Sequence, residues 1–325
     1  MNLIARGDAM KKINLITDTG HFWSMLYVAK LFKFFLEVNY DANVTINNHY
    51  LKGYHNILID ETWTSLVNGR YAEVWWTDTP IPVVRMQGFY SKKVESNKDK
   101  VFNRNYAISN SNKELMEKYG VRVDGVIPRL FNDLMDLEVP KKPEKVYDVL
   151  VIGKWDSVDR KNIRLACEVI GKLKLKAAIV TDKLTIHIRR LSNVDYIPYG
   201  SLSDQAKAKL FAKSKYLLWL SFYEGFGMPV AEAMYLGVPV IYSDCPAHNE
   251  FAVGFPVKPS GTIITAGYGM WMEKKTLKLA DVVDVVRKAL EVTDEEYKEL
   301  CEKAKDRAHR IYDEFLDKVE LILPQ

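Results

Sequence analysis

Two carboxylates and two glycines lie close together in residues 221–234. Gly225 and Gly227 let the backbone approach a ligand and expose amides near a helix start, an arrangement that suits an anion such as a diphosphate. Glu224 and Glu232 are eight positions apart, so we expect them at opposite ends of one cavity. They lack metal-ligand spacing, and carboxylates there most naturally accept hydrogen bonds from sugar hydroxyls. A tight strand-to-helix turn with solvated acidic residues also explains the glycines alone.

The neighbouring segments predict how these residues are positioned. The apolar run at residues 216–220 predicts a buried parallel strand, and residues 238–242 predict a second. Pro229 suits the first position of a helix, and Gly237 can end that helix. The unit is therefore strand, glycine loop, helix, strand. Its loop lies at the carboxyl edge of a sheet, where open α/β folds bind ligands.

The complete string is more specific than its glycines. Residues 224–234, then residues 237–241, Ser243-Asp244 and Glu250, resemble the donor-binding signature of the retaining glycosyltransferases of family 4, the glycosyl transferases group 1. The resemblance implies a nucleotide-sugar donor, UDP- or GDP-linked, with no further cofactor and no metal. It implies that Glu232 binds the ribose hydroxyls and that Glu224 binds the transferred sugar. It also implies contacts to phosphate and sugar from four loop residues, Gly225, Phe226, Gly227 and Met228.

Two lysines follow a third apolar run. Lys154 comes directly after residues 148–153, and Lys161 comes shortly before the next predicted helix. Cations are unfavourable at a helix start unless an anion is bound. The resemblance places both lysines on the donor diphosphate, where fixed positive charge stabilises the departing group. It also places Tyr199, in the loop 198–202, where relatives hold the nucleobase.

Length and composition indicate two soluble domains. A chain of 325 residues exceeds what one core usually serves. The resemblance implies an α/β GT-B fold, with two Rossmann-like doubly wound domains facing a central cleft. We expect an acceptor-side domain at residues 1–143, ending at a polar, proline-bounded linker, and a donor-binding domain at 144–305. A capping box at residues 293–296 begins a long amphipathic helix, whose end, about 306–325, is expected to pack back on the first domain.

The amino-terminal half carries weaker signals. By resemblance, Gly20 approaches the donor phosphate, although a plain turn explains this glycine at least as well. Relatives often have a His near residue 78, and this chain has Asp78. Asp78 either contacts the transferred sugar or the acceptor hydroxyl, or it caps the next turn, which we favour. Residues 255–275 depart from the family's usual run, and no role follows for them from the sequence.

Charge and cysteine content limit the partners and the compartment. The net charge of +4 does not by itself indicate nucleic acid or membrane binding. Three widely spaced cysteines fit a reducing compartment and give no zinc site. No apolar run reaches membrane-spanning length, and the first residues lack a signal-peptide layout, so we expect a cytoplasmic protein.

A peripheral membrane contact is an alternative for the basic stretch at residues 88–104, for which we favour a solvated loop. The helix bearing Lys30 and Lys33 would assist such a contact through three phenylalanines, Phe32, Phe34 and Phe35.

The expected activity is transfer of a sugar, with retained configuration, to an acceptor hydroxyl on a glycan, lipid or protein. Glu224, Lys154 and Lys161 are the candidate catalytic residues. A GT-B epimerase or hydrolase is one alternative, with acid and base groups drawn from His21, Asp60, Glu61 and Asp78. A catalytically silent nucleotide-sugar binding protein is another. The sequence does not identify the nucleobase, the sugar or the acceptor.

Overall fold

The computed structural model describes residues 11–17, 23–59, 72–77, 83–86, 103–118, 120–131, 144–156, 158–267 and 270–324. The chain forms two compact units. The first comprises Met1–Thr79, Gly88–Leu130 and Glu314–Gln325, and the second comprises Pro80–Gln87 and Phe131–Asp313. Five residues with expected roles, Gly20, His21, Asp60, Glu61 and Asp78, lie outside the described residues, as do residues 88–102.

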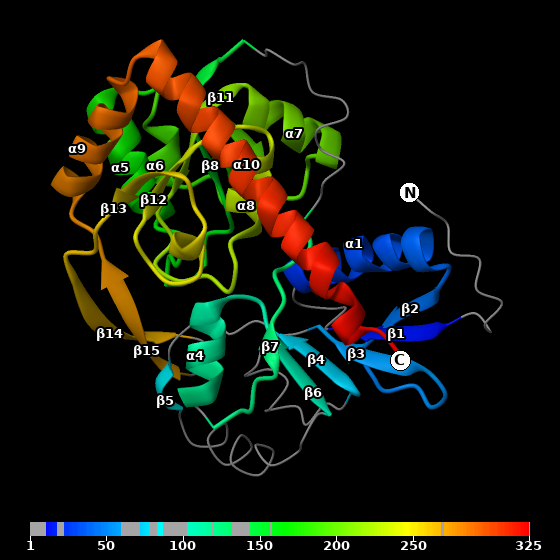
Figure 1. The fold of residues 1–325 in the computed structure, drawn as a ribbon. Helices are drawn as coiled ribbons and strands as arrows, with labels where there is room; N and C mark the ends of the chain where they lie inside the picture. The colour runs from blue at the N-terminus through cyan, green and yellow to red at the C-terminus, as the bar shows by residue number, and fades with distance from the viewer. Residues whose placement is uncertain are drawn as a thin grey trace. The chain divides into compact units, whose positions relative to one another are not determined.

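The first unit contains a six-stranded parallel sheet in the order β2-β1-β3-β4-β6-β7. The residues of its central strands are mostly buried, as in a doubly wound sheet. The strands are β1 (Lys12–Ile16), β2 (Asn43–Asn47), β3 (His55–Leu58), β4 (Val74–Thr77), β6 (Arg104–Ala107) and β7 (Gly125–Val126), and the helices between them are α1 (Trp23–Tyr40) and α4 (Asn110–Lys118). β1 and α1 are the first two elements of this unit (Figure 1).

Helix α1 directs two of its three phenylalanines into the core. Phe32 and Phe35 are buried and pack edge-to-face against Phe315, and Phe32 also meets the ring of Trp76. Phe34 is 55% exposed. The suggestion that all three phenylalanines assist a membrane contact is therefore wrong, because a helix that covers a sheet must bury one face.

The end of the chain belongs to the first unit. Helix α10 (Asp294–Lys318) continues into a short 3-10 helix, η3 (Val319–Ile322). His55 Nε2 lies 3.0 Å from the carbonyl oxygen of Ile322, and Arg104 Nη2 donates to that of Leu323 at 3.2 Å. These bonds satisfy carbonyls at the end of the helix that have no intrahelical partner.

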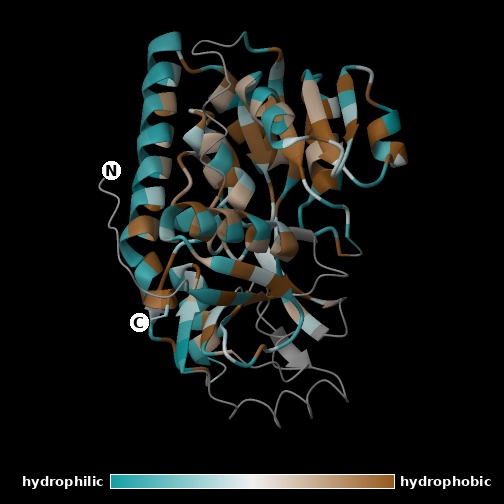
Figure 2. Ribbon diagram, turned by 90° about the vertical axis from the view of Figure 1, so that its right-hand side faces the viewer, coloured by the Kyte–Doolittle hydropathy of each residue, from teal (hydrophilic) through white to brown (hydrophobic). Residues whose placement is uncertain are grey.

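The second unit contains another six-stranded parallel sheet, in the order β10-β9-β8-β11-β12-β13. Figure 2 shows hydrophobic residues concentrated in its strands, whereas much of α10 is hydrophilic. The strands are β8 (Tyr147–Ile152), β9 (Ala177–Thr181), β10 (Val194–Pro198), β11 (Ser214–Trp219), β12 (Val240–Ser243) and β13 (Gly254–Val257). The helices are α5 (Ile163–Leu173), α6 (Ile186–Arg189), α7 (Asp204–Ala212), α8 (Met228–Tyr235), the 3-10 helix η2 (His248–Glu250), α9 (Leu279–Leu290) and α10.

Much of residues 255–275, which had no assigned role, forms part of a separate small sheet. Strands β14 (Gly261–Gly267) and β15 (Met270–Thr276) form an antiparallel hairpin. The other edge of β15 pairs antiparallel with β5 (Val83–Met86), with a register shift at Trp271/Met272. The segment is therefore an ordered element of the second unit (Figure 1).

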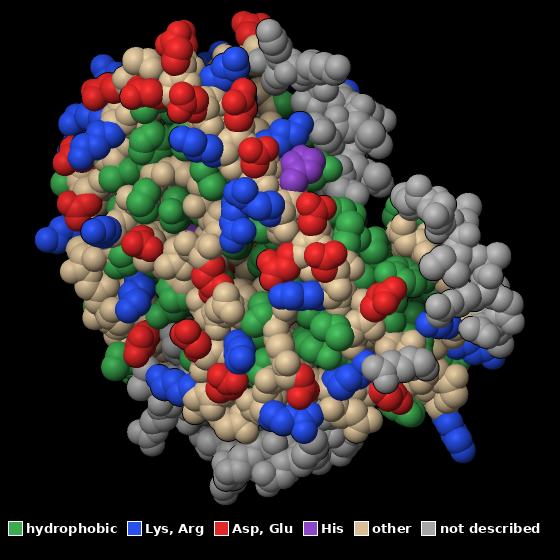
Figure 3. All heavy atoms as spheres, in the orientation of Figure 1, with side chains coloured by type: hydrophobic (Ala, Val, Ile, Leu, Met, Phe, Trp, Pro, Cys, Tyr) green, Lys and Arg blue, Asp and Glu red, His purple; other side chains and the backbone are tan. Residues whose placement is uncertain are grey.

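No helix among the described residues is long and apolar enough to cross a membrane. On the face in Figure 3, acidic and basic side chains are interspersed and do not gather into a patch of one sign.

Candidate functional site

The site is built on two neighbouring strands of the second sheet. β8 and β11 are parallel, with Leu150 opposite Leu217, so the loops that follow them leave the same edge of the sheet side by side. We call residues 153–162 the β8 loop and residues 220–227 the β11 loop. Carboxyl edges of parallel strands are where open α/β sheets bind ligands.

The two loops are joined by hydrogen bonds. The side-chain amide of Asn162 donates to the carbonyl oxygen of Leu220 at 2.6 Å, and the backbone amide of Phe222 donates to that of Arg160 at 3.1 Å. Arg160 Nη1 donates to the carbonyl oxygen of Tyr223 at 2.8 Å. These bonds fix the position of each loop against the other before any ligand is present.

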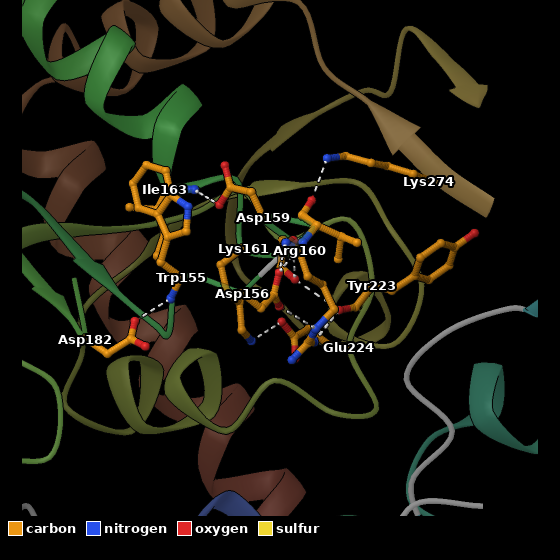
Figure 4. Close-up of polar contacts among 12 residues, drawn as sticks. Trp155, Asp156, Asp159, Arg160, Lys161, Ile163, Asp182, Tyr223, Glu224 and Lys274 are labelled. Carbon is orange, nitrogen blue, oxygen red and sulfur yellow. Dashed lines mark hydrogen bonds and ion pairs between the residues drawn. The ribbon is translucent and has the colours of Figure 1, made fainter. Parts of the chain in front are cut away.

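Glu224 lies between two cations of the β8 loop (Figure 4). Its side chain is 8% exposed. Arg160 Nη1 donates to Oε2 at 3.0 Å, and Lys161 Nζ donates to Oε1. Burial alone would raise the pKa of Glu224, but Arg160 and Lys161 outweigh burial and hold that pKa to about 2. Glu224 is therefore a carboxylate at neutral pH.

Lys161 is enclosed on several sides. Its Nζ lies 4.2 Å from the centroid of the Trp219 ring, a favourable cation–π distance. A Cβ added to Gly153 would lie 3.0 Å from Cγ of Lys161, so this glycine makes room for the lysine stem. Burial, followed by the neighbouring charge of Arg160, lowers the pKa of Lys161 to about 8, although Glu224 opposes the shift. The lysine is charged at neutral pH and loses that charge in mild alkali.

Glu232 belongs to a separate ion pair. It lies in the first turns of α8, with a side chain 3% exposed, and its Oε1 accepts a hydrogen bond from Lys207 Nζ at 2.9 Å. Lys207, in α7, also lies 3.6 Å from Asp204. Burial raises the pKa of Glu232, and Lys207 partly offsets that effect.

Lys154 lies beside Tyr199. Its Nζ is 5.6 Å from the ring centroid of Tyr199, which follows β10 and is 38% exposed. Burial, and after it the negative charge of Glu232, raises the pKa of the Tyr199 hydroxyl. Tyr199 thus lies near Lys154 of the β8 loop and Glu232 of α8.

The start of α8 has the geometry expected from its sequence. Gly227 is the residue before the helix, with φ +93°, and Pro229 lies in the first turn. Helix α8 ends at Tyr235, and Gly237, two residues later, has φ +70° and donates to the carbonyl oxygen of Met234 at 2.8 Å. A Cβ on Gly227 would lie 3.3 Å from Cβ of the buried His248. Both the backbone conformation and the space require glycine at position 227.

The structure brings two of the expected residues, Glu224 and Lys161, into direct contact. Glu232 pairs with Lys207, and Lys154 lies over the ring of Tyr199. The sequence did not lead us to two cations of the site, Arg160 and Lys207. Arg160 directly precedes Lys161, so the basic pair was visible, but Lys207 lies 25 positions from Glu232 and carried no sequence signal.

Two doubly wound units, one with a candidate site at the carboxyl edge of its sheet, are the architecture of the GT-B glycosyltransferases. At 14% sequence identity, the fold matches Alr3699/HepE of Anabaena, solved with UDP and glucose, with a TM-score of 0.66 over 97% of this chain and 99% of that one. It also matches WaaG, a glycosyltransferase involved in lipopolysaccharide biosynthesis, with 11% identity, a TM-score of 0.62, and coverage of 95% and 99%. The family model of the glycosyl transferases group 1 matches residues 138–305, and the chain belongs to this family.

Related sequences include proteins of two filamentous viruses. The chain is 34% identical over 203 residues to "Putative glycosyltransferase 41" of Sulfolobus islandicus filamentous virus (isolate Iceland/Hveragerdi), covering 61% of this chain and 57% of that protein. It is 27% identical over 257 residues to "Putative glycosyltransferase ORF330" of Acidianus filamentous virus 2 (isolate Italy/Pozzuoli), covering 74% and 76%. The match spans less than two thirds of the first relative's length.

Proposed function

We propose that the protein transfers a sugar from a nucleotide-diphosphate donor to an acceptor hydroxyl with retention of configuration. The observation that carries this proposal is the placement of Glu224, Arg160 and Lys161 on two bonded loops at one edge of the second sheet. Fixed cations make strong charge-assisted hydrogen bonds to a diphosphate, and a carboxylate accepts hydrogen bonds from sugar hydroxyls. The site offers both within one cluster.

Each side chain has a proposed task. Arg160 and Lys161 bind the diphosphate and stabilise the charge that it gains as the glycosidic bond breaks. Glu224 orients the transferred sugar through its hydroxyls. Glu232 holds the ribose hydroxyls, with Lys207 keeping the carboxylate charged. Lys154 also binds the diphosphate, beside Tyr199, which contacts the nucleobase. The amides of residues 225–228 bind phosphate and sugar.

In the proposed reaction, every bond that breaks or forms, and the proton that moves, belongs to the sugar donor or the acceptor. The bond between the anomeric carbon and the diphosphate oxygen breaks, and its electron pair leaves with the diphosphate. The acceptor oxygen forms the new bond on the same face of the sugar, and its proton passes to a leaving phosphate oxygen. The protein contributes positioning and charge stabilisation.

Incubation with nucleotide sugars tests this function. UDP-glucose is the first donor, because Alr3699/HepE was also solved with it, and GDP-linked sugars form a second arm. We expect release of nucleoside diphosphate that depends on an added glycan, lipid or peptide acceptor, with an α-linked product from an α-linked donor. Release without an acceptor indicates a hydrolase, and an altered free donor indicates an epimerase. Either outcome contradicts transfer.

A further inference from the structure

Lys274 contacts both loops of the site from a different sheet. It lies in β15, and its Nζ donates to the carbonyl oxygen of Val158 at 2.9 Å (Figure 4). The same ammonium lies 4.9 Å from the ring centroid of Phe222. Val158 belongs to the β8 loop and Phe222 to the β11 loop. One side chain of the hairpin therefore touches the two segments that carry Arg160, Lys161 and Glu224.

The pairing of the hairpin explains why Lys274 faces the site. Residues paired across antiparallel strands share a face of the sheet, and alternate residues along a strand do too. Lys274 lies opposite Ile263 and shares a face with Met272, which is completely buried. Lys275 lies on the opposite face, where its Nζ donates to Thr262 Oγ1 at 2.9 Å. The two adjacent lysines therefore differ in what they contact.

The β8 loop is held by hydrogen bonds from inside and from outside. Asp159 and Asn162 have φ values of +47° and +50°, in the left-handed region that Asp and Asn adopt more readily than other non-glycine residues. Asp156 Oδ1 accepts from the amides of Val158 and Arg160 at 3.2 and 2.9 Å, which holds the loop from inside. Lys274 holds the carbonyl of Val158 from outside. Val158 itself packs against Phe222, Tyr223 and Cys245.

We propose that Lys274 is a positioning residue of the donor site. It fixes the β8 loop in the conformation that presents Arg160 and Lys161, and the hairpin β14–β15 is thereby part of the nucleotide-binding machinery. Lys274 itself does not touch the donor. This inference rests on the proposed function, in which those two cations bind the diphosphate.

Three variants separate positioning from general stability. Lys274→Met keeps the aliphatic stem but removes the hydrogen-bonding ammonium and its charge. Lys274→Arg keeps a charged group that can donate a hydrogen bond. Lys275→Met is the matched control on the opposite face. We expect Lys274→Met to raise the Kd for UDP about tenfold, as for loss of a hydrogen bond from a charged donor. Lys274→Arg should recover most of that loss, and Lys275→Met should bind like the wild type. Lys274→Gln replaces the Met variant if the latter does not fold.

Hydrogen exchange supplies the second readout. Without ligand, the amides of residues 158–162 should exchange faster in Lys274→Met than in Lys275→Met, while the melting temperatures of the two variants agree. Equal UDP affinity and equal exchange in wild type and Lys274→Met would overturn the inference, as would equal losses in both Met variants. If wild type binds neither UDP nor GDP, the proposed function fails, while exchange of the β8 loop still tests the positioning role.

Discussion

Lys161 and Glu224 form a buried ion pair that links the β8 loop to the β11 loop. Arg160 binds the second oxygen of the same carboxylate. In the free protein, Glu224 therefore offsets part of the positive charge of these two cations. Under the proposed function, a donor diphosphate competes with this internal carboxylate, and the transferred sugar takes up the carboxylate that is released.

Replacing Glu224 separates nucleotide binding from transfer. In Glu224→Gln, the neutral amide no longer competes for Arg160 and Lys161, so UDP should bind at least as tightly as to wild type. Transfer from a UDP-sugar should fall by about a hundredfold or more, because the sugar loses a charged hydrogen-bond partner. Calorimetry at pH 6 measures binding, since loss of Glu224 lowers the pKa of Lys161 further from about 8. Glu168→Gln, on the exposed face of α5, is the control.

Loss of UDP binding in a folded Glu224→Gln protein would show that Glu224 holds the site open and does not compete with the diphosphate.

Replacing Lys207 should make nucleotide binding depend on pH. Burial raises the pKa of Glu232, and Lys207 opposes this shift while Asp204 reinforces it. Lys207→Met should therefore raise the pKa of Glu232 further and favour its uncharged form. Because ribose hydroxyls donate more strongly to a carboxylate than to a carboxylic acid, UDP affinity should fall about tenfold near pH 6 and recover as pH rises.

Titration of UDP at pH 6, 7 and 8 tests this prediction, with Lys207→Arg as the variant that keeps the charge. If Lys207→Met lowers UDP affinity by the same factor at each pH, the electrostatic role of Lys207 is contradicted.

Gly227→Ala should weaken UDP binding with little change elsewhere. The left-handed φ costs an alanine about 1–2 kcal/mol, and its Cβ would press on His248. The β11 loop should shift, and UDP affinity should drop about tenfold. Gly120→Ala is a matched control, because Gly120 has φ +79° with nothing within 4 Å of the added Cβ and lies in the first unit. The control should lose stability but keep its UDP affinity.

Phe315→Ala should destabilise the first unit. Phe315 is fully buried among three aromatic rings, Phe32, Phe35 and Trp76, although it lies at the end of α10. Truncating a buried Phe costs about 3–5 kcal/mol. Urea unfolding should show that loss, whereas Leu316→Ala, at a position 40% exposed, should change little. Similar stability of both variants would contradict the packing of the chain end on the first unit.

Much of the second unit was predictable from local sequence. Short apolar runs identified β8, β11 and β12, because buried parallel strands have little polar alternation. Pro229 and Gly237 identified the limits of α8 through backbone chemistry alone. The capping box was also correct, since Thr293 Oγ1 accepts from the amide of Glu296 at 3.2 Å and Glu296 Oε2 accepts from that of Thr293 at 2.9 Å.

The partners within the site were less predictable. The basic run shows that Arg160 and Lys161 are adjacent, but not that both contact Glu224, which lies 64 and 63 positions further along the chain. Lys207 and Lys274 reach the site through tertiary structure from a helix and a hairpin. Such contacts follow from packing, and no local pattern specifies them.

Titration of UDP into wild type, Glu224→Gln and the double variant Lys161→Met/Glu224→Gln tests the central claim most directly. The double variant removes a cation without leaving a buried carboxylate unpaired, so the comparison with Glu224→Gln isolates Lys161. Wild type should bind UDP, and the double variant should bind about tenfold or more weakly than Glu224→Gln. Equal affinity of these two variants would show that the diphosphate does not lie on Lys161 and would contradict the account.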